Sequence, residues 1–255
     1  MERRKMVSIS VGVIVVVGLV VFVGIPLVQT HFHYECAYPA GSTKHAVLFL
    51  RALRAPSTNV TITFVDNPNL LYSIDVVQYE PGMHHHYSLY EPSYDPDAYH
   101  LVLDGMGDYK IASIDVILGT ATYYQVFIDG RNLNVTLIYD NGAELAGQDV
   151  KISTNEGICN IIFTENVNFT DTGLNVELSF FTILNVFVDL PEGMNGKLSV
   201  PHDVNFGYTE MVGWSLTDSG LDKPNVFSTS STDEPLLAIN FAASRDQYAF
   251  GSLHD

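Results

Sequence analysis

The sequence predicts an all-β ectodomain, β-solenoid-like or β-sandwich, behind one N-terminal transmembrane helix. Three observations support this fold class: an uncharged apolar segment near the start, alternation of apolar and polar residues through most of the remainder, and lines of sequence that recur. The expected parts are a basic cytoplasmic leader at 1–6, a transmembrane helix at 7–28, a stem at 29–43, a repeat-containing β-rich ectodomain at 44–205, and a C-terminal β cap or extension at 206–255.

The segment 7–28 holds no ionisable side chain. At about 1.5 Å per residue, a helix of this length crosses a hydrocarbon core of about 30 Å. Arg3, Arg4 and Lys5 precede it, which favours a cytoplasmic N-terminus. We therefore expect a single-pass protein of the cell membrane whose remaining residues are extracytoplasmic.

Two alternatives concern the same segment. A cleavable signal peptide would also be basic and then apolar, but this run is long and no A-x-A-like site follows it. A pilin-like filament subunit would begin similarly, yet Lys5 and Met6 stand where a small residue usually precedes the apolar run. The uncleaved anchor is the preferred interpretation.

The predicted ectodomain is strongly acidic. Without Glu2, Arg3, Arg4 and Lys5, the chain keeps 28 acidic and 9 basic residues. This balance disfavours nucleic acid and anionic membrane surfaces as partners, and it favours solubility or cation binding.

Two lines of sequence resemble one another at an offset of 60 residues, 114–129 ("IDVILGTATYYQVFID") and 174–189 ("LNVELSFFTILNVFVD"). A shorter relative, 149–163, shares the opening of a polar residue, Val, any residue, Leu or Ile, then Gly or Ser. It has one extra residue before its Asn-Ile-Ile-Phe ending. Such self-similarity predicts stacked supersecondary units with 114–129 and 174–189 as equivalents.

The other elements follow from the same alternation. Strands are expected at 45–50, 58–65, 70–79 and 98–104, because β-branched and aromatic residues alternate with polar ones there. The proline-rich tract 80–97 reads as a loop, since proline cannot continue a strand ladder.

One stretch resembles a known family. The line 149–163, followed by "LPEGMNGKLSV" at 190–200, is similar to the toastrack-type putative-adhesin family, over about residues 110–205. The resemblance implies a membrane-linked, extracytoplasmic β-solenoid without known catalytic residues. The line 174–188 departs from the pattern, because Phe180-Phe181-Thr182 stands where a loop glycine is expected.

The loop tract holds the best candidate for metal binding. His84 and His86 would share one face of an extended strand, with His100 beyond and several carboxylates nearby. Neutral imidazoles are good ligands for transition metals, so His84, His86 and His100 are the candidate metal ligands. Acidic turns such as "DGMGD" at 104–108 offer oxygen ligands suited to Ca²⁺. Ordinary solvated turns are the preferred explanation of both features, so no cofactor is expected.

Cysteines and glycosylation sequons add candidate modifications. Cys36 and Cys159 would both lie on the outer side, where a disulfide between them would persist. Their spacing does not show that they meet, and two free buried thiols are the alternative. Asn59, Asn134 and Asn168 lie in N-x-S/T sequons, which a glycosylating host would modify at the surface.

The sequence therefore predicts a membrane-anchored, extracytoplasmic, β-rich protein that binds, adheres or scaffolds. No nucleophile elbow, S-x-x-K motif, P-loop or dinucleotide-binding fingerprint occurs in it, so we expect no enzyme. The expected partner is the membrane through 7–28 and an unidentified protein or glycan, without nucleic acid. The alternatives are a metal-binding protein or enzyme that uses the 80–100 tract, and a filament subunit.

Overall fold

The computed structural model describes residues 28–53, 57–80, 98–104, 110–120, 122–140, 144–145, 149–164, 168–169, 173–191, 194–220, 223–229, 237–242 and 248–254. Every regular element within these ranges is a β-strand, which confirms the all-β prediction. The described ranges contain no helix that is long and apolar enough to cross a membrane. The predicted helix at 7–28 lies outside them apart from its last residue.

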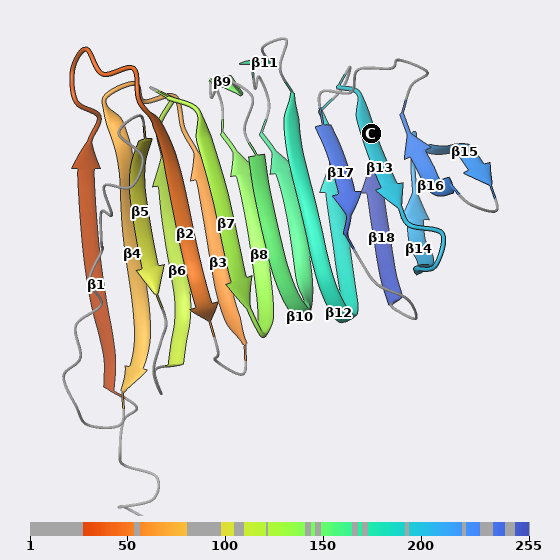
Figure 1. The fold of residues 1–255 in the computed structure, drawn as a ribbon, viewed down its shortest axis with the longest axis horizontal. Coiled ribbons are helices and arrows are strands. Elements are labelled where there is room, and N and C mark those ends of the chain that lie inside the picture. The colour runs from red at the N-terminus through yellow and green to blue at the C-terminus, as the bar shows by residue number, and fades with distance from the viewer. Residues whose placement is uncertain are drawn as a thin grey trace, which may run out of the picture.

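The strands form two facing layers, joined because two long strands bend and contribute a limb to each (Figure 1). The bent strands are β10 (Asp149–Phe163) and β12 (Leu174–Asp189). Layer A, in spatial order, consists of β5 (Ala98–Asp104), β2 (His45–Leu53), β7 (Tyr124–Gly130), the first limbs of β10 and β12, β17 (Leu237–Phe241), β13 (Gly196–Val200), β16 (Lys223–Ser228) and β15 (Ser215–Gly220). Layer B consists of β1 (Val28–Ala37), β4 (Leu70–Glu80), β6 (Lys110–Leu118), β3 (Thr58–Phe64), β8 (Asn132–Tyr139), the second limbs of β10 and β12, β18 (Tyr248–His254) and β14 (Asn205–Met211). A separate small sheet pairs β9 (Glu144–Leu145) with β11 (Asn168–Phe169).

One strand of layer A and the next strand of layer B make a rung, and the rungs stack through parallel pairing in both layers. Parallel stacking of this kind is the β-solenoid arrangement. The spatial order of the rungs is β5–β6, β2–β3, β7–β8, β10, β12, β17–β18 and β13–β14. At each end of the stack, two rungs therefore lie in the reverse of their order in the chain: β5–β6 lies outside β2–β3, and β13–β14 lies outside β17–β18.

Antiparallel strands cover both ends. β4 and then β1 extend layer B beyond β6, and β16 and then β15 extend layer A beyond β13. The predicted stem at 29–43 is therefore corrected, because alternating side chains let Val28–Ala37 pair with β4 along its whole length. The segment 206–255, predicted as a C-terminal cap or extension, contains strands of two kinds. β15 and β16 cover an end of the stack, whereas β17 and β18 lie inside it.

The core fills the space between the layers with inward side chains. One ladder in layer A runs Leu48, Val126, Val150, Val176 and Ile239 on successive strands, all 3 % exposed or less. In layer B, the rings of Phe64, Tyr139 and Phe163 stack at 4.7 and 4.9 Å. Identical register on neighbouring strands places like residues side by side, which explains why the strands share a sequence pattern.

The stacking register corrects one predicted equivalence. Val176 lies beside Val150, and Val150 lies beside Val126, so 124–130 is the counterpart of 174–178 in layer A. The line 114–129 instead joins the end of one rung to the start of another. An offset of 60 residues aligns β6 of layer B with the first limb of β12 in layer A. The two strands look alike because inward and outward residues alternate in the same way in both layers.

The corners of β10 and β12 also differ from the expectation. The openings align as predicted, with Asp149 beside Asn175, but the extra residue lies in β12, between the partners of Thr154 and Glu156. Gly157 of β10 lies so close to the Leu133 carbonyl that a Cβ atom would collide with it. β12 turns the same corner without a glycine: Phe180 is buried and Phe181 faces solvent.

Candidate functional site

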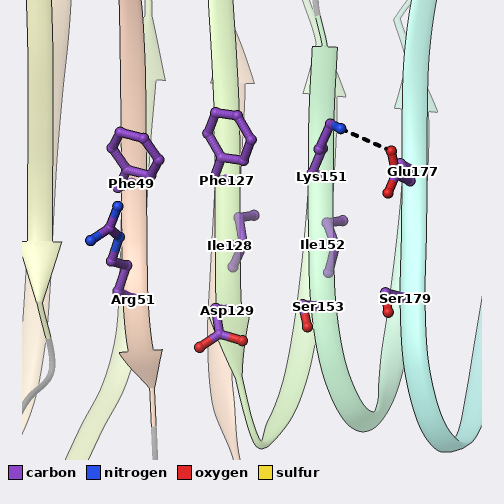
Figure 2. Close-up of a pocket in the computed structure, with 10 residues that line it drawn as sticks. All are labelled: Phe49, Arg51, Phe127, Ile128, Asp129, Lys151, Ile152, Ser153, Glu177 and Ser179. Carbon is purple, nitrogen blue, oxygen red and sulfur yellow. Dashed lines mark ion pairs between the residues drawn. The ribbon is translucent and has the colours of Figure 1, made fainter. Parts of the chain in front are cut away.

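The candidate site is a trough of about 560 Å³ on the outer face of layer A. It crosses β2, β7 and the first limbs of β10 and β12, as Figure 2 shows. Each of these strands contributes the same four-residue phrase, in which the first and third residues point inward to the core. The second and fourth residues point outward, and they line the trough.

The second positions of the phrases form an aromatic and charged row: Phe49, Phe127, Lys151 and Glu177. The Phe49 and Phe127 rings stack with their centroids 4.9 Å apart and an angle of 16° between planes. The Arg51 guanidinium lies 4.4 Å from the centroid of the Phe49 ring, a cation–π arrangement. The Lys151 Nζ and Glu177 Oε2 atoms are 3.0 Å apart in an exposed ion pair, which contributes at most about 1 kcal/mol.

The fourth positions form a polar row: Arg51, Asp129, Ser153 and Ser179. The side chains of Asp129, Ser153 and Ser179 form no hydrogen bond or ion pair with any residue that the structure describes. A carboxylate accepts hydrogen bonds, a hydroxyl both donates and accepts, and a guanidinium donates. This row therefore offers several uncommitted polar groups to a ligand.

A second polar row lies on the other side of Phe49 and Phe127, and its side chains form hydrogen bonds with one another. The Asn175 amide donates to Asp149 at 3.1 Å, and the Asn240 amide donates to Asn175 at 3.1 Å. The Tyr123 hydroxyl also donates to Asp149, and burial together with this hydrogen bond raises the pKa of Tyr123. This row stabilises the stack, and the row of Asp129 is the one left for recognition.

The structure places one of the three predicted metal ligands. His100 lies in β5, and its ring stacks on Phe49 with a centroid distance of 6.3 Å. His84 and His86 lie outside the described residues. Within the described ranges, no group of three or more His, Cys, Asp or Glu side chains has an arrangement that could hold a metal ion.

Cys36 and Cys159 are free thiols in the structure, so the possible disulfide between them is not formed. Cys36 lies in β1 and Cys159 in β10, and the strands β4, β6, β3 and β8 separate them within layer B. With neighbouring strands about 4.8 Å apart, their separation far exceeds the reach of a disulfide. Cys159 is a buried core side chain, and burial raises its pKa to about 12.

Two of the three sequons are neighbours on the outer face of layer B. Asn59 of β3 and Asn134 of β8 are register partners, and the Asn134 amide donates to the Asn59 side-chain oxygen at 3.1 Å. Asn168 lies in β11. Glycosylation of these residues stays a prediction.

Sequence reasoning missed the trough, although a signal for it exists. The phrases are Leu-Phe-Leu-Arg at 48–51, Val-Phe-Ile-Asp at 126–129, Val-Lys-Ile-Ser at 150–153 and Val-Glu-Leu-Ser at 176–179. The repeat pattern treats the second position as any residue, yet it is this variable position that faces solvent. The signal in the sequence is Phe at the outward-facing position of two phrases, and only the stacking order shows that the two strands are neighbours.

Comparisons with known proteins give a weak structural likeness. No family model and no curated protein matches the chain. The structure of a "putative cell adhesion protein" from Clostridium sporogenes matches with a TM-score of 0.49 and 9% identity, over 89% of this chain and 100% of that chain. A "putative adhesin" from Parabacteroides distasonis matches with a TM-score of 0.24 and 8% identity, over 89% and 96% of the two chains. At such scores and identities, these matches establish neither a family nor an activity for this chain.

Proposed function

We propose that the chain is a membrane-anchored, extracytoplasmic binding protein of the adhesion or scaffolding type, and that it catalyses no reaction. The observation that supports binding is the trough, where uncommitted polar side chains border an outward-facing aromatic pair on a rigid sheet. A small number of polar groups around an apolar surface is typical of a recognition site. The apolar segment 7–28 and the basic residues before it support the anchor and the orientation.

The orientation is tested by labelling intact cells with a membrane-impermeant thiol reagent. Cys36 is half-buried on the edge strand β1, whereas Cys159 is fully buried and serves as an internal control for folding. We expect label on intact cells that is lost in a Cys36→Ser variant. Label that appears only after the membrane is permeabilised would contradict the proposed location.

Binding is tested by the retention of cells that display the full chain on a layer of cells of the same strain. Phe127→Ala removes an outward ring from the trough, so it should lower retention. Ile162→Ala is the matched control, because Ile162 faces outward on layer B and is 39 % exposed. Retention no greater than that of cells lacking the protein would contradict the adhesive function.

A further inference from the structure

The trough lies on interior strands, which limits how a ligand can be held. β2, β7, β10 and β12 each pair on both sides within layer A, so their main-chain groups are already hydrogen-bonded. An extended peptide that binds as an added strand needs an open edge. Recognition in the trough must therefore come from side chains alone.

The charges of the trough favour a neutral ligand. The positive charges of Arg51 and Lys151 are balanced by the negative charges of Asp129 and Glu177. Lys151 and Glu177 already form an ion pair with each other at 3.0 Å. An anionic ligand would approach a chain whose formal net charge is −17, which is unfavourable. A cationic ligand would meet Arg51 above the aromatic pair, at 4.4 Å from the Phe49 ring centroid.

The remaining groups fit a ligand with one apolar face and a rim of hydroxyls. Phe49 and Phe127 supply apolar surface, and beside them Asp129, Ser153 and Ser179 offer acceptors and donors about 4.8 Å apart, one on each strand. A hydroxyl group both donates and accepts, so it can pair with a carboxylate, a hydroxyl or a guanidinium. Sugar rings combine a C–H face with such hydroxyls.

We propose that this trough binds a neutral saccharide, with its C–H face on Phe127 and its hydroxyls on Asp129, Ser153 and Arg51. This inference rests on the proposed binding function and specifies its ligand. The trough is open to solvent, so a single saccharide chain should bind at micromolar to millimolar concentration. Several displayed copies would then hold a polymeric surface by avidity.

Titration calorimetry tests the proposal with the full chain in a detergent that lacks a sugar headgroup. The probes are the hexasaccharides of β-1,4-glucose, α-1,4-glucose and β-1,4-N-acetylglucosamine, each at millimolar concentration. We expect at least one to bind. Phe127→Ala and Asp129→Ala should each weaken that binding about tenfold or more. Asp129→Asn keeps a hydrogen-bonding side chain and should weaken it less.

Ile162→Ala on layer B is the matched control and should bind as the wild type does, and thermal unfolding of each variant checks that it is folded. The proposal is overturned if none of the three hexasaccharides binds, or if Phe127→Ala binds as tightly as Ile162→Ala. Failure with saccharides, together with cell retention that still depends on Phe127, would remove the ligand class and leave the binding function. Absence of retention by the wild type would remove the function itself.

Discussion

At the scale of the residue, Cys159 shows how the core constrains chemistry. It lies in an inward ladder of layer B between Val135 and Val186, and it is fully buried. Its thiol therefore packs as a small apolar group. Burial raises its pKa to about 12 from an ordinary value of 9.0, because the thiolate would be desolvated.

This shift predicts a loss of stability at alkaline pH. Above pH 9, the thiol ionises in the unfolded chain but stays protonated in the folded one, so the unfolded state binds fewer protons. The free energy of unfolding should then fall by about 1.4 kcal/mol per pH unit between pH 9 and the folded pKa. Cys159→Val, which continues the valine ladder, should abolish this contribution. Urea unfolding of both proteins at neutral pH and at about pH 11 measures it.

Two buried tyrosines also titrate at alkaline pH. Burial raises the pKa of Tyr124 equally in wild type and variant, so its effect cancels in the difference. The pKa of Tyr139 is raised mainly by burial and also by the charge of Cys159, so the difference between the two proteins includes the coupling of Cys159 to Tyr139. An equal alkaline loss in the two proteins would show that the Cys159 thiol ionises in the folded state.

At the scale of the element, the corner of β12 shows where a repeat is allowed to vary. β10 turns with Gly157 against a neighbouring carbonyl, and β12 turns with an extra residue and two phenylalanines. Phe180 packs edge-on against Phe241 of β17, with ring centroids 5.7 Å apart. The Thr182 hydroxyl donates to the Asn155 carbonyl of the adjacent corner at 2.7 Å.

Substitution of the two phenylalanines should separate their roles. Phe180 is 1 % exposed, so Phe180→Ala should lower the free energy of unfolding by about 3–5 kcal/mol through lost burial and a cavity. Phe181 is 63 % exposed, and Phe181→Ala should change it by about 0.5 kcal/mol or less. Equal effects in urea unfolding would mean that the corner is not packed as described.

The elements also show what the sequence can and cannot predict. Alternation predicts strands such as β3 and β8, because one face of each is buried. It cannot predict the layer, since inward and outward positions alternate identically in both layers, and this explains the wrong pairing of 114–129 with 174–189. The trough was missed for a related reason: Phe127 and Asp129 become a site only when β2 and β10 lie beside β7, which depends on the stacking order.

At the scale of the whole molecule, the exchanged rungs make the end of the chain structurally internal. β17–β18 lies between β12 and β13–β14, and it pairs with both. Loss of β17–β18 therefore removes an internal rung of the stack, next to its last rung. In a solenoid with nearest-neighbour stability, the rung beyond it would then be left without its partner.

A pair of deletions tests this arrangement. A chain that ends at residue 236 should lose hydrogen-exchange protection in 196–211 as well as the missing strands. In the matched control, 190–236 is replaced by a ten-residue linker, as long as the segment 164–173 that joins β10 to β12. The control keeps β17–β18 against β12 and should retain protection in 174–189. Full protection of 196–211 in the truncated chain would contradict the stacking order.

The exchanged order of the rungs also determines how long β12 stays without its partner strands during synthesis of the chain. Once β12 has emerged, both of its limbs must wait for β17 and β18 while residues 190–236 are synthesised. At roughly 5–20 residues per second, this interval lasts on the order of several seconds, during which two parallel strand edges have no partner. A ribosomal stall between β12 and β17 would prolong this exposure, so the rate at which residues 190–236 are translated should affect how much of the nascent chain aggregates.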